Sequence, residues 1–116
     1  MLTIYGIPNC DTMKKARKWL ADNGIDYEFH DYKKNGVDNK QLLAWEKQVG
    51  WEVLLNRRGM MWRKLSDEQK ANIDKSSAIE IMLELPSIIK RPVLVTDKGE
   101  TLVGFKEEEY VKLFAR

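Results

Sequence analysis

The opening segment constrains the fold most, because it has the pattern of a strand, a tight turn, a helix and a second strand. Leu2–Tyr5 is a short alternating apolar stretch that is closed by breakers at Gly6 and Pro8. Thr12–Asn23 has helical spacing, and Asp26–His30 alternates again as a strand does. Two strands joined through a helix form a parallel pair with a right-handed crossover. The chain is therefore expected to begin with a βαβ unit.

The end of the chain predicts an antiparallel hairpin followed by a helix. Val93–Thr96 and Thr101–Gly104 are the expected strands, and Gly99 between them can take the positive φ of a tight turn. Lys106–Ala115 has the pattern of a closing helix. Together with the βαβ unit, these elements predict an α/β fold with a mixed sheet, and the thioredoxin-like fold is the simplest match.

The middle of the chain is rich in helical pattern. Asn39–Val49 and Ser76–Leu85 are the expected helices, and Ser66–Gln69 is typical of a helix cap. No repeat, low-complexity tract or linker separates this stretch from the rest, and 116 residues suit one core. We therefore expect a single domain over residues 1–116 that includes the helical middle.

Charge and composition exclude several functional classes. The net charge is +2, so no global field favours nucleic acid, and no stretch approaches the length of a membrane span. One cysteine cannot form an internal disulfide, one histidine leaves no zinc set, and no basic leader precedes an apolar run. We expect a cytoplasmic protein with no bound metal and no direct contact with membrane or nucleic acid. Four tryptophans are expected to pack in or beside the core rather than stack on bases: Trp19, Trp45, Trp51 and Trp62.

Cys10, the single cysteine, lies where the turn meets the first predicted helix. Unpaired amides and the positive end of the helix dipole favour a thiolate at that place. A lone intracellular cysteine is most often a small buried hydrophobe, but Cys10 has the polar neighbours Asn9 and Asp11. We interpret Cys10 as a reactive thiol, with the Asp11 carboxylate acting against its activation.

Spacing separates the chemistries that a reactive thiol can support. A cysteine phosphatase conventionally has five residues between cysteine and arginine, but here that position is Ala16 and Arg17 comes one later. A cysteine–histidine hydrolase could use only His30, which we expect at a surface or strand edge. A dithiol enzyme would have its second cysteine at Met13. Thiol redox chemistry with an outside thiol, such as glutathione or a glutaredoxin, remains.

Several cations could stabilise a thiolate or bind an anion near it. Lys14 opposes the helix dipole, which is easier to explain if an anion lies above the helix end. Arg57 and Arg58 are adjacent in a loop, and Arg91 precedes Pro92 at the start of a strand. With Cys10 as the catalytic residue, the candidate anion- or glutathione-binding residues are Asn9, Lys14, Arg57, Arg58, Arg91 and Pro92.

Three ordered blocks resemble the arsenate reductase (ArsC/Spx) family, and its YffB branch most. They are Tyr5–Thr12, Leu54–Leu65 and Ile88–Val95, and the resemblance covers essentially the whole chain. It implies a thioredoxin-like (glutaredoxin-like) mixed four-stranded sheet, with a helical insertion of about residues 36–86 between the βαβ and ββα halves. It also implies a cis Arg91–Pro92 peptide bond, whereas local evidence alone favours trans.

The site residues of the family transfer unevenly. Its nucleophile matches Cys10, and the arginine before the strand-opening proline matches Arg91. Three positions depart from genuine arsenate reductases, with Gly6 in place of a histidine, and Asn56 and Gly104 each in place of an arginine. Arg57 or Arg58 would then have to substitute for one missing arginine, and we expect little or no arsenate reductase activity.

The resemblance and the residues together lead to one leading function and one alternative. We expect a cytoplasmic thiol oxidoreductase that uses Cys10, with glutathione as a co-substrate rather than a tightly bound cofactor. Its partners would be glutathione or a glutaredoxin and a small anionic or thiol-bearing substrate. The alternative is an Spx-like regulatory or protein-binding module that docks on RNA polymerase, with Cys10 non-catalytic. Spx-like regulators often carry a cysteine pair, which Met13 breaks here.

Overall fold

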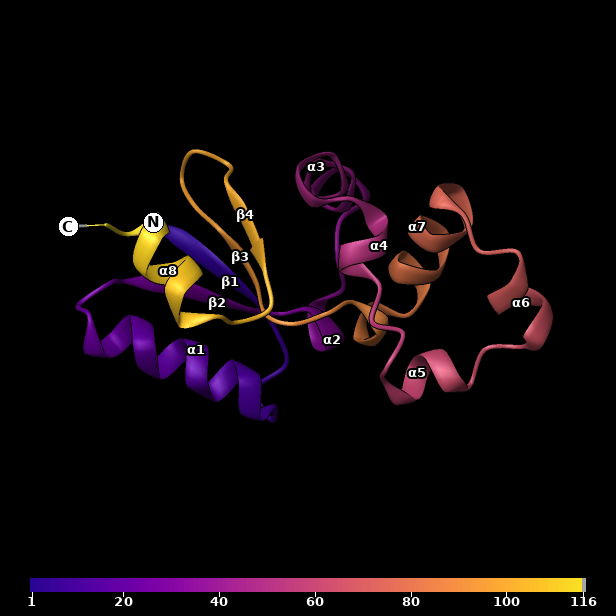
Figure 1. Ribbon diagram of the computed structural model, residues 1–116, viewed down its shortest axis with the longest axis horizontal. Helices are drawn as coiled ribbons and strands as arrows, with labels where there is room; N and C mark the ends of the chain where they lie inside the picture. The colour runs from indigo at the N-terminus through magenta and orange to yellow at the C-terminus, as the bar shows by residue number, and fades with distance from the viewer. Residues whose placement is uncertain (116) are drawn as a thin grey trace. The chain divides into compact units, whose positions relative to one another are not determined.

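The computed structural model describes residues 1–115, which form two compact units (Figure 1). The sheet unit consists of Met1–Asp31 and the chain from Arg91 onward, and the helical unit consists of Tyr32–Lys90. The sheet unit therefore brings together the two ends of the sequence. The helical unit contains the predicted insertion of residues 36–86.

The sheet unit contains a mixed four-stranded sheet in the order β2-β1-β3-β4. Its strands are β1 (Leu2–Gly6), β2 (Tyr27–Asp31), β3 (Val93–Val95) and β4 (Thr101–Val103). β1 pairs parallel with β2 and antiparallel with β3, and β3 pairs antiparallel with β4. Gly99 in the β3–β4 turn has a φ of 85°. The predicted βαβ opening, closing hairpin and mixed sheet are confirmed.

Two helices pack on one face of this sheet, α1 (Asp11–Asp22) and α8 (Glu107–Leu113) (Figure 1). The α1 side chains at helical spacing, Met13, Ala16 and Leu20, are fully buried against that face. Gly24, with a φ of 66°, follows the end of α1 and turns the chain toward β2. The apolar side chains that recur every 3.6 residues on α1 thus pack against those that alternate along the strands, and together they form the core.

The core of the sheet unit ends in an aromatic cluster around Tyr110. Its ring is fully buried and lies 5.5 Å from the ring of Trp19, 4.8 Å from Phe105 and 6.3 Å from Phe114, between centroids. Burial, with a smaller effect of the Glu109 charge, raises the pKa of the Tyr110 phenol well above its ordinary value. Within residues 1–115 its hydroxyl has no hydrogen-bond partner.

Replacing Tyr110 with phenylalanine is therefore expected to stabilise the protein. The variant keeps the ring contacts but removes a buried hydroxyl whose desolvation costs about 1–3 kcal/mol. The free energy of unfolding should rise by about 1 kcal/mol, measured by urea denaturation. Tyr32→Phe is the matched control and should be destabilising, because the equally buried Tyr32 hydroxyl donates a hydrogen bond to the Ile89 carbonyl at 2.6 Å. A loss of stability in Tyr110→Phe would contradict this account.

The helical unit is built from short helices around an apolar core of its own. They are α2 (Tyr32–Asn35), α3 (Asn39–Val49), α4 (Trp51–Leu54), α5 (Met60–Arg63), α6 (Asp67–Ala71), α7 (Lys75–Glu84) and the 3₁₀ turn η1 (Pro86–Ile88). Ser66 caps α6, since its hydroxyl accepts a hydrogen bond from the Gln69 N–H at 3.1 Å and the Gln69 side chain returns the bond. The predicted cap is confirmed. In the part of the chain that the structure describes, no helix combines the length and apolar character needed to cross a membrane.

The single-turn helices α2, α4 and α5 were not predicted, because four residues are too few to show a helical period. The tryptophans lie as expected, with Trp45 buried and Trp19, Trp51 and Trp62 partly buried.

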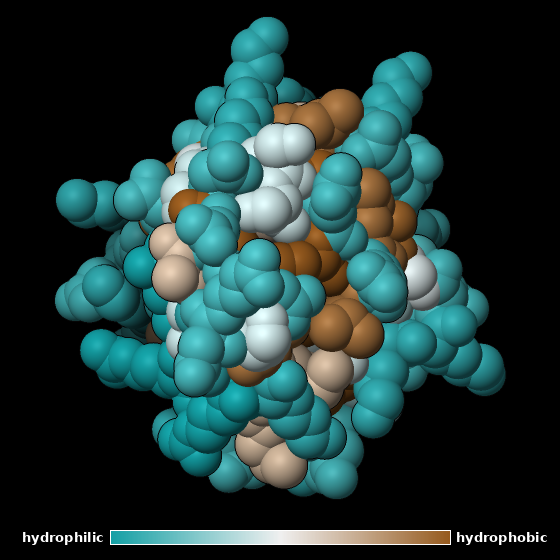
Figure 2. Space-filling view, turned by 90° about the vertical axis from the view of Figure 1, so that its right-hand side faces the viewer, coloured by the Kyte–Doolittle hydropathy of each residue, from teal (hydrophilic) through white to brown (hydrophobic). Residues whose placement is uncertain are grey.

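Apolar side chains also reach the surface of the helical unit. Figure 2 shows hydrophobic patches there between hydrophilic side chains. A groove of about 680 Å³ lies between α3 and α7, and its apolar lining comes from Leu43, Ile79 and Leu83. Leu43 is 43% exposed, which is unusual for a leucine on an amphipathic helix.

Candidate functional site

Cys10 is the N-cap residue of α1, with an extended backbone (φ −143°, ψ 129°). Its carbonyl accepts the first hydrogen bond of the helix, from the Lys14 N–H at 3.0 Å. The thiol is partly exposed and packs beside the core of the sheet unit. The predicted position at a helix N-terminus is confirmed, and α1 begins one residue earlier than expected.

The pKa of the Cys10 thiol is set by opposing effects. Partial burial raises the pKa, but the Met13 N–H, a hydrogen bond and the charge of Arg91, and the Thr12 N–H lower it. The net result is a pKa below the ordinary value. Asp11 is exposed and does not prevent this lowering. The helix N-terminus and one arginine therefore favour the thiolate at this site.

Sheet register brings Arg91 to Cys10. Tyr5 of β1 is opposite Val93 of β3, so the residues that precede β3 lie beside the turn that follows β1. The Arg91–Pro92 peptide bond is cis, as the resemblance implied, and Pro92 is buried. Nε of Arg91 is also buried. Arg91, which lowers the pKa of Cys10, is thus positioned by the residues that begin β3.

Replacing Arg91 with alanine is expected to raise the pKa of Cys10 and to slow its alkylation at neutral pH. The loss of one charge-assisted contact should reduce the rate about tenfold, after allowing for the higher intrinsic nucleophilicity of a more basic thiolate. Iodoacetamide alkylation followed from pH 5 to 10 measures the midpoint. Arg17→Ala is the control for loss of charge, because that guanidinium stacks over Phe29 at 4.6 Å and does not act on the sulfur. Equal midpoints for the two variants would contradict the role of Arg91.

Asn9 and Lys14 lie on either side of Cys10, and both are exposed. Lys14 belongs to the first turn of α1 and forms no ion pair with any residue in 1–115. Its ammonium group is therefore available to an anion from solution. Binding of a ligand by Asn9 or Lys14 stays a prediction.

Arg57 and Arg58 belong to the helical unit, and both are exposed. The guanidinium carbon of Arg57 lies over two indole rings, 5.4 Å from the Trp51 centroid and 5.6 Å from the Trp62 centroid. The Arg58 backbone N–H donates to Oδ1 of Asn56 at 3.1 Å. The two arginines, equivalent in the sequence, thus differ in structure. Their expected part in anion binding stays a prediction.

His30, the single histidine, lies on the edge strand β2. Its ring is 5.0 Å from the ring of Tyr5, its register partner on β1. The predicted strand-edge position is confirmed. Across residues 1–115, no three histidine, cysteine or carboxylate side chains are grouped to hold a metal ion.

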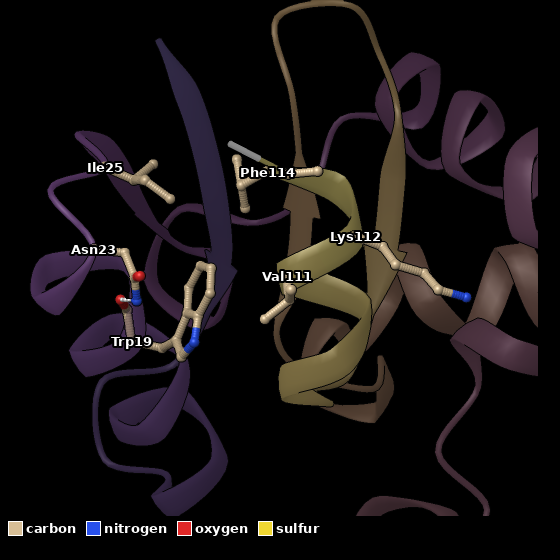
Figure 3. Close-up of a pocket in the computed structure, with 7 residues that line it drawn as sticks. Trp19, Asn23, Ile25, Val111, Lys112 and Phe114 are labelled. Atoms are coloured by element: carbon tan, nitrogen blue, oxygen red, sulfur yellow. Dashed lines mark hydrogen bonds between the residues drawn. The ribbon is translucent and has the colours of Figure 1, made fainter.

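A cavity of about 420 Å³ in the sheet unit lies away from this site. Trp19 of α1 and Asn23, the residue after α1, line one side, and Val111 of α8 and Phe114, the residue after α8, line the other (Figure 3). Cys10 is at the other end of α1, roughly 18 Å away along a 12-residue helix. The cavity and the Cys10 thiol are therefore separate features of the sheet unit.

Known proteins with similar sequences and structures show which family the chain belongs to. The family model described as the ArsC family matches residues 5–113. The chain belongs to the ArsC family. A solved structure of a YFFB protein is 50% identical, with a TM-score of 0.93, and the match covers 99% of this chain and 100% of that one. An arsenate reductase (ArsC) related protein from Brucella melitensis is 56% identical, with a TM-score of 0.77 and coverage of 99% and 95%.

The same ArsC family connects the chain to regulators. The global transcriptional regulator Spx of Streptococcus agalactiae is 29% identical over 111 residues, which is 94% of this chain and 80% of that protein. The relatives thus include both reductase-related proteins and transcriptional regulators. The chain resembles a thiol oxidoreductase of the ArsC family.

At Gly6, one of the positions that differ from the ArsC reductases, a neighbouring side chain occupies the space beside the backbone. A Cβ atom on Gly6 would lie 2.3 Å from Sδ of Met13, which is fully buried. A histidine at position 6, as expected in arsenate reductases, would therefore have to displace the buried Met13 side chain. Met13 also occupies the place of a second dithiol cysteine and is directed into the core. Gly6 and Met13 belong to different predicted elements, and no local signal in the sequence links them.

The other two departures from the ArsC reductases have structural roles. Gly104 has a φ of 79°, which disfavours any side chain, and its N–H donates to the Pro92 carbonyl at 2.8 Å. Asn56 supplies the side-chain acceptor for the Arg58 N–H, and its own N–H donates to the Ile88 carbonyl at 2.9 Å. Both residues therefore stabilise the local backbone conformation, and neither carries the positive charge of the arginine it replaces.

Proposed function

We propose that this protein is a cytoplasmic thiol oxidoreductase that works with glutathione through the single thiol of Cys10. The observation that carries the proposal is the lowered pKa of Cys10 at the start of α1, beside Arg91. The thiolate attacks a disulfide substrate, forms a mixed disulfide with one half and releases the other half as a thiolate. A glutathione thiolate then attacks the substrate sulfur and regenerates the Cys10 thiolate.

The reductant must come from outside the protein. Cys10 is the only cysteine, and Met13 fills the place of a resolving thiol. Glutathione or a glutaredoxin therefore completes each turnover, and glutathione acts as a co-substrate rather than a bound cofactor. Arg91 supplies positive charge at the thiolate, and Lys14 adds an exposed cation in the first turn of α1, which favours a small anionic or thiol-bearing substrate.

Three measurements test this function. Incubation with glutathione disulfide should give one glutathionyl adduct, located on Cys10 by mass spectrometry. Reduction of hydroxyethyl disulfide should proceed in the presence of glutathione, glutathione reductase and NADPH. An alkylation midpoint at or above the free-cysteine value of roughly 8.5 would count against the proposal.

A docking module is the second candidate function. It is supported by the Spx relatives and by the apolar groove between α3 and α7. In this alternative the helical unit docks on a protein such as RNA polymerase, and Cys10 is not catalytic. Affinity capture with purified RNA polymerase tests it, with Leu43→Glu as the variant that should abolish capture. Capture that fails with the unaltered protein would contradict this alternative.

A further inference from the structure

We propose that Trp51, Arg57 and Trp62 form a carboxylate-binding site in the helical unit. The two tryptophans position the Arg57 guanidinium, and Arg57 makes the contact with the ligand. The identity of the ligand rests on the proposed function, under which it is the glycyl carboxylate of glutathione. The binding chemistry depends only on contacts within the helical unit.

Arg57 contacts one indole from the helix before its loop and one from the helix after it. Trp51 begins α4 and Trp62 lies in α5, and the guanidinium carbon lies 5.4 Å and 5.6 Å from their ring centroids. Both indoles are partly buried, so one part of each ring packs against the helical unit. Between them, Asn56 closes the loop through its hydrogen bonds to Arg58 and Ile88. A long flexible side chain is therefore restricted before any ligand binds.

Stacking leaves the donors of Arg57 available. A guanidinium that lies over aromatic rings uses its faces, whereas its five N–H groups point outward in its plane. That edge matches the two oxygens of a carboxylate in a bidentate pair. Because the side chain is already ordered, less conformational entropy is lost when the pair forms. Arg57 is exposed, so a ligand can reach it.

The surrounding charge also favours an anion. Residues 51–64 carry four cations and one carboxylate, Glu52. Within residues 1–115, none of these cations forms an ion pair. Basic runs are usually solvated, and Arg58 is exposed without aromatic contacts in the described chain. Arg57 differs because two indoles from different helices restrict it.

The experiment uses the full chain and S-methylglutathione, which has no thiol and cannot react with Cys10. Calorimetry should give a dissociation constant that rises about tenfold in Arg57→Lys, because lysine cannot form the bidentate pair. Trp62→Leu should weaken binding about fivefold, and Trp62→Phe should recover most of this loss. Arg63→Lys, a conservative change at another exposed arginine of this segment, is the matched control and should change the constant less than about twofold. The Arg57 Nε–Hε cross-peak in a ¹⁵N spectrum should shift on titration.

Blocking the glycyl carboxylate of S-methylglutathione as its ethyl ester should weaken binding about as much as Arg57→Lys. Equal binding of the ester, an unmoved Arg57 cross-peak or a dominant effect of Arg63→Lys would overturn the site. Tighter binding of inorganic phosphate than of S-methylglutathione at Arg57 would overturn its assignment to carboxylate. Failure of Cys10 exchange with intact binding would refute the proposed function alone, and intact exchange without an Arg57 response would refute this site alone.

Discussion

Replacing Cys10 with serine is expected to abolish glutathione-coupled disulfide turnover while preserving the fold. A hydroxyl is not ionised at neutral pH, so the lowered pKa that favours the Cys10 thiolate has no equivalent in the variant. The rate should fall by at least about a thousandfold, to the level without protein. Serine is a favourable N-cap residue, so α1 should be as stable as before or slightly more stable.

The measurement is the hydroxyethyl disulfide assay, with circular dichroism and thermal unfolding as the check on folding. A folded Cys10→Ser variant with more than about one per cent of the original rate would show that the chemistry lies elsewhere. The same variant separates the two candidate functions. A docking module would keep its partner in affinity capture after the substitution, whereas a thiol oxidoreductase would lose all thiol-dependent turnover.

The regular elements of the sheet unit could be predicted because their information is local. The alternation in Leu2–Tyr5 and the buried stripe of Met13, Ala16 and Leu20 each follow the period of one element. The place of Cys10 follows from the breakers that separate these two patterns. Strand pairing then follows from general rules of handedness and hairpin connection.

The contacts that distinguish this site could not be predicted in the same way. Gly6 and Met13 share one space because a strand end meets a helix, and nothing in either local pattern shows that contact. Arg57 and Arg58 are adjacent and chemically identical, yet within the described residues only Arg57 lies over two indole rings. Such differences arise from side chains that meet only after several short helices have packed.

Arsenate reduction is expected to be slow or absent, although Cys10 is expected to exchange with glutathione disulfide. Forming an arsenic–sulfur bond to a dianion requires positive charge around the oxyanion, and each charge-assisted contact contributes about 1.5–3 kcal/mol. Two of the three arginine positions in the family pattern are Asn56 and Gly104. Asn56 is neutral and holds its own loop, and Gly104 has no side chain and a φ of 79°.

Loss of both contacts would reduce transition-state stabilisation by roughly 3–6 kcal/mol, which slows the reaction on the order of a hundredfold to ten-thousandfold. Glutathione-coupled arsenate turnover, compared directly with that of a true arsenate reductase, measures the difference. Turnover at a comparable rate that Cys10→Ser abolishes would contradict the prediction. Repeating the assay with Arg57→Lys and Arg58→Lys would then show whether either arginine replaces a missing ligand. The expected result is a rate near background in all of these variants. Of the three arginine positions in the family pattern, only Arg91 keeps its arginine here, and Arg91 supplies the positive charge beside the sulfur.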